Sequence, residues 1–127
     1  MSQSRPDRGE FYRADQMTKM KLGDNIAIER VTGETVAMTR ITMSKGGKSP
    51  YHVHEDEQLL ILIEGRLQVR DGEIADAAIH EMKPGDCYRA PSNVRHQVIA
   101  HEDSVFIEAF GPGPMLTSPI GEMAEPD

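Results

Sequence analysis

Apolar and polar residues alternate along this chain in short runs that are separated by turn-forming residues. Such runs predict β-strands, because successive side chains of a strand point to opposite faces of a sheet. Turn signals divide the runs: Thr32-Gly33 follows the first one, and Asp71-Gly72 indicates a hairpin. We predict strands over residues 26–31, 35–43, 59–63, 67–69, 79–82, 87–90, 97–100 and 104–110.

The run from Leu59 to Ile63 differs from the others because it contains five apolar residues in succession. It is short for a buried helix and Gly65 follows closely, so it predicts a strand covered on both faces. The interior of a small barrel covers only one of these faces. The second face must meet either the surroundings of the second sheet or a partner subunit.

Eight or more short strands at this spacing predict an all-β domain, built as an antiparallel sandwich or barrel. With 127 residues, the chain is long enough for one core and too short for two. We expect a single domain over residues 1–127, with its core at about 26–111. A flexible segment at 1–10 and a tail at 112–127 flank the core. Residues 73–78 are compatible with a helical turn and are left open.

Composition restricts the possible partners. The net charge of −7, with 28% charged residues, argues against nucleic acid or an anionic membrane as the main partner. No apolar run approaches the roughly 18 residues that span a bilayer, and the polar N-terminus has no secretory pattern. Cys87 is the only cysteine, which excludes an internal disulfide. We therefore expect a cytoplasmic protein.

Candidate metal chemistry begins at His52 and His54, which share a face of the strand that we expect there. Gln58 is at an even offset from both, and His96 can reach the same point from a neighbouring strand. Three imidazoles and an amide oxygen suit one divalent transition metal ion, such as Fe, Mn, Ni, Zn or Cu. The alternative is that these histidines are ordinary surface groups, but this combination of residues favours a metal site.

Strand parity extends the candidate site to apolar residues beside the ligands. If Gln58 faces inward, Leu60 and Leu62 do so too and give the cavity an apolar wall.

The last strand places Glu108 on the same face as Phe106 and Phe110. A carboxylate between two aromatic residues is costly in a plain core, because an unpaired buried charge is unfavourable. Glu108 is therefore either on the solvent side or beside the cavity, where it would act as a general acid/base.

Arg40 lies on the face of Met38 and Thr42 in the second strand. Inside a barrel it would bind a substrate carboxylate through paired hydrogen bonds. The alternative is an outward arginine on a two-sided sheet.

The spacing of glycines around the histidines adds a recognisable pattern. Gly46 stands before the His-x-His pair and Gly65 after Gln58, and the second half of the pattern is Gly85-Asp86, Pro91, Asn93 and His96. This pattern resembles the two-part signature of the cupins, and the resemblance covers about residues 26–111. It implies an antiparallel jelly-roll β-barrel, a homodimer that binds a small molecule, and a metal ion held by His52, His54, Gln58 and His96.

One departure from that family has a chemical consequence. Most metal-binding cupins have glutamate where this chain has Gln58, and the adjacent Glu57 should leave the opposite face of its strand. An amide ligand leaves the metal with less negative charge and makes it more electrophilic. This favours isomerase, tautomerase or lyase chemistry over the activation of dioxygen.

A narrower resemblance is to small cupins of pectin and alginate breakdown, which linearise 4,5-unsaturated uronates with a bound metal. Their acidic residue and the phenylalanine two positions later match Glu108 and Phe110. Their arginine further on has no counterpart within residues 111–115, so Arg40 would have to replace it. We expect a metal-dependent enzyme acting on a small sugar acid or related carbonyl compound; the alternatives are a dioxygenase and a non-catalytic ligand-binding cupin.

Overall fold

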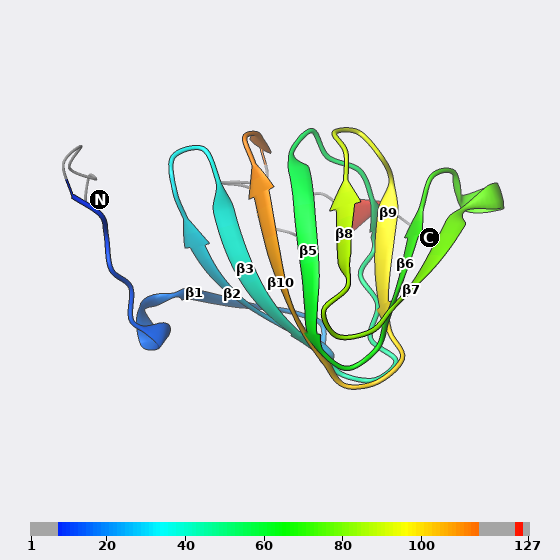
Figure 1. Ribbon diagram of the computed structural model, residues 1–127, viewed down its shortest axis with the longest axis horizontal. Coiled ribbons are helices and arrows are strands. Elements are labelled where there is room, and N and C mark those ends of the chain that lie inside the picture. The colour runs from blue at the N-terminus through cyan, green and yellow to red at the C-terminus, as the bar shows by residue number, and fades with distance from the viewer. Residues whose placement is uncertain (1–7, 115–123, 126–127) are drawn as a thin grey trace.

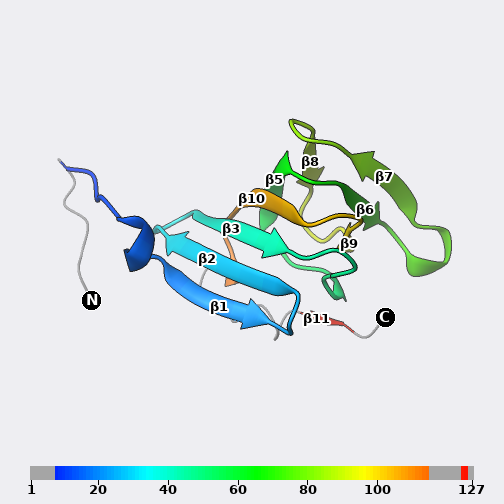
Figure 2. The same ribbon diagram turned by 90° about the horizontal axis from the view of Figure 1, so that it is seen from below.

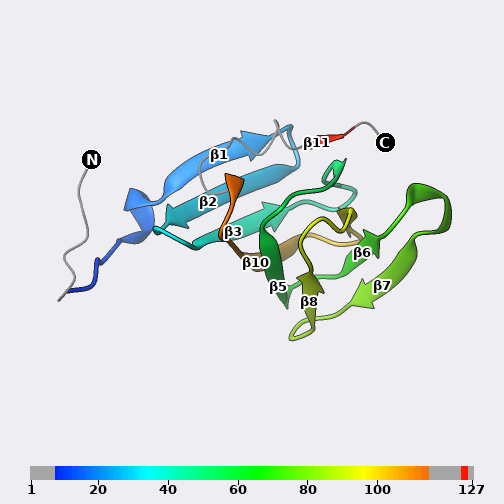
Figure 3. The ribbon, with the colours of Figure 1, turned by 90° about the horizontal axis from the view of Figure 1, so that it is seen from above.

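Two antiparallel sheets form the protein, and a computed structural model describes residues 8–114 and 124–125. The six-stranded sheet has the order β1-β2-β3-β10-β5-β8, which Figure 1 shows from left to right, and the five-stranded sheet has the order β11-β4-β9-β6-β7. In Figures 2 and 3 the six-stranded sheet curves from β1 round to β8. β6 and β7 of the five-stranded sheet lie at the end of the molecule opposite β1. The all-β fold agrees with the prediction.

The strand bounds follow the alternation in the sequence. The strands are β1 (Thr18–Leu22), β2 (Ile26–Thr32), β3 (Ala37–Met43), β4 (Tyr51–His52), β5 (Glu57–Glu64), β6 (Leu67–Asp71), β7 (Ala78–Met82), β8 (Cys87–Ala90), β9 (His96–Ala100), β10 (Ser104–Gly111) and β11 (Ala124–Glu125). All eight predicted strands are confirmed. Two short 3-10 turns, η1 (Ala14–Gln16) and η2 (Ile74–Asp76), are also present, and η2 occupies the segment that was left open.

Two strands, β1 and β11, were not predicted. β1 is largely exposed and carries two lysines, and β11 has only two residues, too few to show alternation. β4 is the strand expected at the His-x-His pair, and it ends at His52. β11 pairs with β4, so part of the predicted tail contributes to a sheet. Most of the segment 1–10, which we expect to be flexible, lies outside the described residues.

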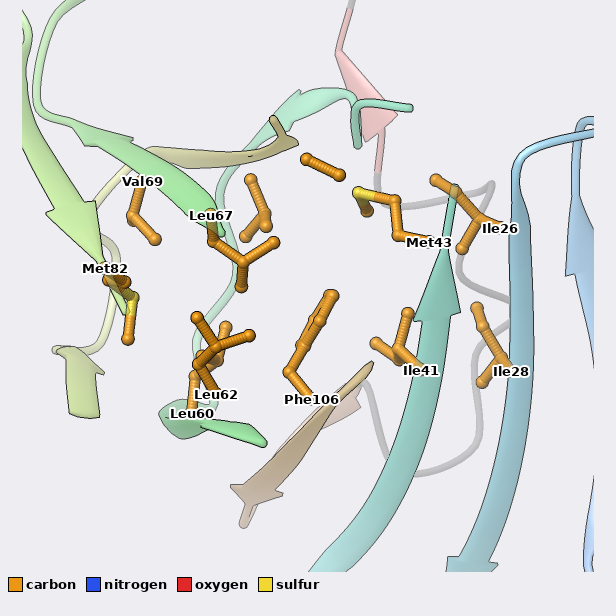
Figure 4. Packing of buried hydrophobic residues seen from close by; sticks show 12 residues of the cluster. Ile26, Ile28, Ile41, Met43, Leu60, Leu62, Leu67, Val69, Met82 and Phe106 are labelled. Atoms are coloured by element: carbon orange, nitrogen blue, oxygen red, sulfur yellow. The ribbon is translucent and has the colours of Figure 1, made fainter. Parts of the chain in front are cut away.

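The core lies between the two sheets, and Figure 4 shows its packing. Each inward face collects alternate residues of its strands, so Ile41 of β3 and Phe106 of β10 face Leu67 and Val69 of β6. Hydrophobic burial of these side chains is the main favourable contribution to folding. The core cluster comprises Ile26, Ile28, Ile41, Met43, Leu60, Leu62, Leu67, Val69, Met82, Val98, Ala100 and Phe106.

The register of the six-stranded sheet carries polar residues into this interior. One row across the sheet joins Arg30, Thr39, Glu108 and Leu60 on successive strands β2, β3, β10 and β5. The next row places Phe110 opposite Gln58. Polar side chains from distant parts of the sequence therefore lie side by side on the inner face.

The outer face of β5 differs from the prediction. Leu59, Ile61 and Ile63 are 54%, 38% and 47% exposed, while Leu60 and Leu62 are buried. The expectation that this strand is covered on both faces is therefore wrong for the single chain, because the second sheet covers only the inner face. No helix among the described residues is long and apolar enough to cross a membrane.

Candidate metal centre

His52, His54 and His96 form a tight cluster in which their candidate ligand atoms all lie within 4.8 Å of one another. His52 ends β4, and it pairs directly with His96, the first residue of β9. His54 lies two residues beyond β4, in the segment where the chain crosses to the other sheet. The expectation that both residues of the His-x-His pair lie on a strand is therefore half correct, and the loop carries His54 to the same point.

Backbone carbonyls orient all three imidazole rings. The Nδ1 atoms of His52, His54 and His96 donate to the carbonyl oxygens of Pro50, Asp56 and Val94, at 2.8, 2.8 and 3.0 Å. Each ring therefore carries its proton on Nδ1 and keeps the lone pair of Nε2 available. Hydrogen bonds of this kind commonly fix the orientation of metal-binding histidines.

The donor atoms of the cluster fit a metal ion. His96 is fully buried, and its Nε2 atom has no hydrogen-bond partner in the described part of the chain. Burial, and then the neighbouring His52, lower the pKa of His96 to about 3. The imidazole is therefore neutral at physiological pH, and its unpaired acceptor would be costly without a cation. A divalent transition metal satisfies this requirement.

Gln58 reaches the cluster from β5, the neighbouring sheet. Its Oε1 lies 3.1 Å from His54 Nε2, and its Nε2 donates to Glu108 Oε2 at 2.8 Å. Because His54 carries its proton on Nδ1, His54 Nε2 and Gln58 Oε1 are both acceptors, and they face each other. A cation shared by the two atoms would stabilise this arrangement. The side chain of Glu57 leaves the opposite face and pairs with Arg89, so Gln58 is the residue placed to be a fourth ligand.

Glu108 faces the interior, which excludes the alternative that it lies on the solvent side. It is half-buried, and its side chain lines a cavity together with Arg30 and Gln58. Burial raises the pKa of Glu108 to about 7, although the charge of Arg30 and the hydrogen bond from Gln58 oppose this rise. The carboxyl can therefore hold or release a proton near neutral pH, as general acid/base chemistry requires.

The cavity has a volume of about 50 Å³. Its polar and aromatic lining includes Arg30, His52, Gln58, Phe106, Glu108 and Phe110. Phe106 and Phe110, which the sequence placed on the same face as Glu108, line this cavity with it. Leu60 and Leu62 do point inward, but they are buried on the inner face of β5 and are not part of this cavity lining.

Arg40 does not face the cavity, and the expectation that it anchors a substrate carboxylate is wrong. It lies on the outer face of β3, where its guanidinium forms an ion pair with Glu29 at 2.8 Å. The physical reason is parity: Ile41 and Met43 occupy the inward face of β3, so Arg40 points outward.

Arg30 is the interior arginine, and the sequence analysis missed it. It is 6% exposed and lines the same cavity as Glu108. A signal was present, because Arg30 has the same parity as the apolar residues Ile26 and Ile28 in β2.

Solved structures with similar folds support the architecture. An RmlC-like cupin from Shewanella frigidimarina NCIMB 400 aligns with a TM-score of 0.72 at 20% identity, covering 84% of this chain and 93% of that chain. An oxalate decarboxylase of Bacillus subtilis aligns with a TM-score of 0.75 at 18% identity, covering 94% of this chain and 34% of that chain. The formate complex of the Lactobacillus farciminis oxalate decarboxylase aligns with a TM-score of 0.70 at 15% identity, covering 84% and 35%.

The present chain thus spans about a third of the length of these decarboxylases. Comparison with the curated proteins finds no match. The family model described as "Cupin domain" matches residues 39–109, which is more than half of the sequence. Together with the two antiparallel sheets and the histidine cluster, this match shows that the chain belongs to the cupin family.

Proposed function

We propose that this protein is a metal-dependent enzyme that acts on a small sugar acid or a related carbonyl compound, with isomerase, tautomerase or lyase chemistry. The observation that carries the proposal is the contact between Glu108 and Gln58. Through this contact a carboxyl group lies beside the histidine cluster, and it lines the same cavity as His52, which supports a role in proton transfer. The composition and the single cysteine fit a cytoplasmic location.

The proposed roles follow from position. His52, His54, His96 and Gln58 would hold one divalent transition metal ion. When bound, such an ion supplies Lewis acidity to a substrate oxygen. Glu108 is placed to remove or return a proton on the substrate.

The aromatic wall completes this assignment. Phe106 and Phe110 are buried and border the cavity, so they limit the water around the reacting groups.

Two other functions remain as alternatives. A dioxygenase would need a redox-active metal with open coordination positions. The neutral amide of Gln58 favours dioxygenase chemistry less than a carboxylate ligand would. A non-catalytic binding protein would use the same cavity without needing proton transfer by Glu108. Full activity with Zn(II), which has no redox chemistry, would exclude the dioxygenase.

The test begins with purified protein loaded with Mn(II) or Zn(II), since the similar Bacillus subtilis oxalate decarboxylase has Mn(II) centres. A thermal-shift screen of sugar acids and keto acids would identify a substrate, and Glu108→Gln would then be assayed. We expect turnover to fall by about 100-fold or more while the metal stays bound, the usual scale for loss of a general acid/base. Unchanged turnover would remove Glu108 from the mechanism, and a ligand that binds without being converted would indicate the binding protein.

A further inference from the structure

We propose that Arg30 is a specificity-determining residue that binds the carboxylate of the substrate within the cavity. This inference rests on the proposed function and assigns its substrates to small acids that also carry a hydroxyl or carbonyl oxygen. Arg30 comes from β2, outside the residues that contact the histidine cluster.

The first observation is an incompletely paired, buried guanidinium. Arg30 is 6% exposed, and its Nε and Nη2 atoms have no hydrogen-bond partner among the described residues. Burial of unpaired donors on a charged group is strongly unfavourable unless something else satisfies them. The two atoms lie in the guanidinium fork that matches the two oxygens of a carboxylate.

The second observation is that the charges of Arg30 and Glu108 interact without an ion pair between them. Within the described part of the chain, no ion pair joins Arg30 to Glu108, although both side chains line the cavity. Their strands β2 and β10 are separated by β3, so their backbones are about 10 Å apart. Glu108 instead accepts its hydrogen bond from Gln58.

The third observation is the way in which Arg30 is held. Its Cζ atom lies 5.0 Å from the centre of the Phe110 ring, so an aromatic face supports one side of the guanidinium. Thr39 lies between Arg30 and Glu108 in the sheet register, is fully buried, and has no hydrogen-bond partner for its Oγ1 among the described residues. Because Thr39 does not line the cavity, the acceptor oxygens of a bound carboxylate are assigned to Arg30.

The size of the cavity indicates which part of a ligand it can hold. A volume of about 50 Å³ corresponds to roughly four water positions. This space suits the acid end of a ligand, and a larger ligand would extend out of the cavity, which is not fully enclosed. One end of such a ligand would meet Arg30, and its hydroxyl or carbonyl oxygen would lie toward the histidine side, which His52 and Gln58 line.

The test uses glycolate and its neutral isostere glycolamide as probes. Calorimetric titration of Mn(II)-loaded wild-type protein should show at least about tenfold tighter binding of glycolate, because a charge-assisted pair is lost with the amide. In Arg30→Met this preference should disappear, with glycolamide binding unchanged. Arg30→Lys keeps the positive charge but loses the paired donors of the guanidinium, so it should retain part of the preference for glycolate. Arg40→Met is the matched control on the outer face and should behave like wild type.

The outcomes separate the two proposals. Metal content is measured on the same samples, and failure to bind either Mn(II) or Zn(II) would refute the proposed function. If Mn(II) is bound but wild-type protein shows no preference for glycolate, or if Arg30→Met keeps the preference, the role of Arg30 is refuted alone. If Arg30→Met does not fold, Arg30→Lys decides: an undiminished preference refutes the paired contact, and a reduced one supports it.

Discussion

Glu108 determines which end of the Gln58 side chain faces the histidines. The carboxylate oxygen Oε2 accepts a hydrogen bond from Gln58 Nε2 at 2.8 Å, and this leaves Gln58 Oε1 at 3.1 Å from His54 Nε2. An amide can present either oxygen or nitrogen, and only its oxygen can bind a cation. The contact therefore links the candidate proton-transfer group to the candidate metal ligand.

Two substitutions at Glu108 should separate these roles. Glutamine keeps an oxygen that can accept from Gln58 Nε2, whereas leucine has no acceptor and frees the amide to turn. We expect Glu108→Leu to weaken metal binding by about 10–100-fold, the usual effect of losing a group that orients a ligand. Glu108→Gln should keep wild-type affinity, measured by competition with a metal-binding dye. Equal affinities in both variants would show that Gln58 does not depend on Glu108.

Removing one histidine should abolish the metal site. His54→Ala deletes a buried imidazole from a cluster whose ligand atoms lie within 4.8 Å of one another. We expect wild-type protein to contain one equivalent of metal by elemental analysis and the variant to lose stoichiometric binding. His101→Ala is a suitable control, because His101 is exposed and pairs with Glu81 at 3.2 Å. A full equivalent in His54→Ala would mean that other residues form the site.

The homodimer expected from the sequence stays a prediction, and the outer face of β5 is its best candidate surface. Leu59, Ile61 and Ile63 are partly exposed there, and the neighbouring Ile107 and Ala109 of β10 extend the apolar area. Two ion pairs flank it, Arg40 with Glu29 at 2.8 Å and Arg89 with Glu57 at 2.6 Å. An apolar centre with a polar rim is typical of a protein–protein interface.

A charge at the centre of this face should separate the subunits. We expect Ile61→Glu to shift the solution mass from dimer to monomer at micromolar concentration, since a buried unpaired charge costs about 2–5 kcal/mol. Ile79→Glu is the matched control: Ile79 is 56% exposed on β7, in the other sheet. A monomeric wild-type protein, or an Ile61→Glu variant that stays dimeric, would contradict this assignment.

Two glycines in positive-φ conformations should respond differently to alanine. Gly65 has a φ of 99° between β5 and β6, and a Cβ there would collide with Ser104 and the Asp103 carbonyl. Gly72 has a φ of 93° and open space around it. We expect Gly72→Ala to lower the free energy of unfolding by about 1–2 kcal/mol through the backbone alone. Gly65→Ala should lower the free energy of unfolding by roughly 1–3 kcal/mol more than Gly72→Ala does, because the added methyl group overpacks its surroundings. Urea unfolding measures both, and equal losses would mean that the backbone at Asp103 and Ser104 moves aside.

The sequence by itself indicated most of the strands and the histidines that cluster in the candidate metal centre. Alternation predicted all the longer strands except β1, because burial of one face imposes a period of two on a strand. The His-x-His pair and His96 indicated a transition metal, because imidazole is a favoured ligand for such ions. The strands and the convergence of the three histidines are confirmed, since each depends on residue type and local spacing, and the metal itself stays a prediction.

Only the tertiary structure decided which polar residues meet. The contact between Gln58 and Glu108 joins residues 50 positions apart, and it depends on the register between β5 and β10. Local spacing likewise left the direction of Arg40 open, and burial against the second sheet turned Arg30 inward and Arg40 outward. Strand register and the choice of buried face come from packing over the whole domain, so residues that local patterns treat alike acquire opposite environments.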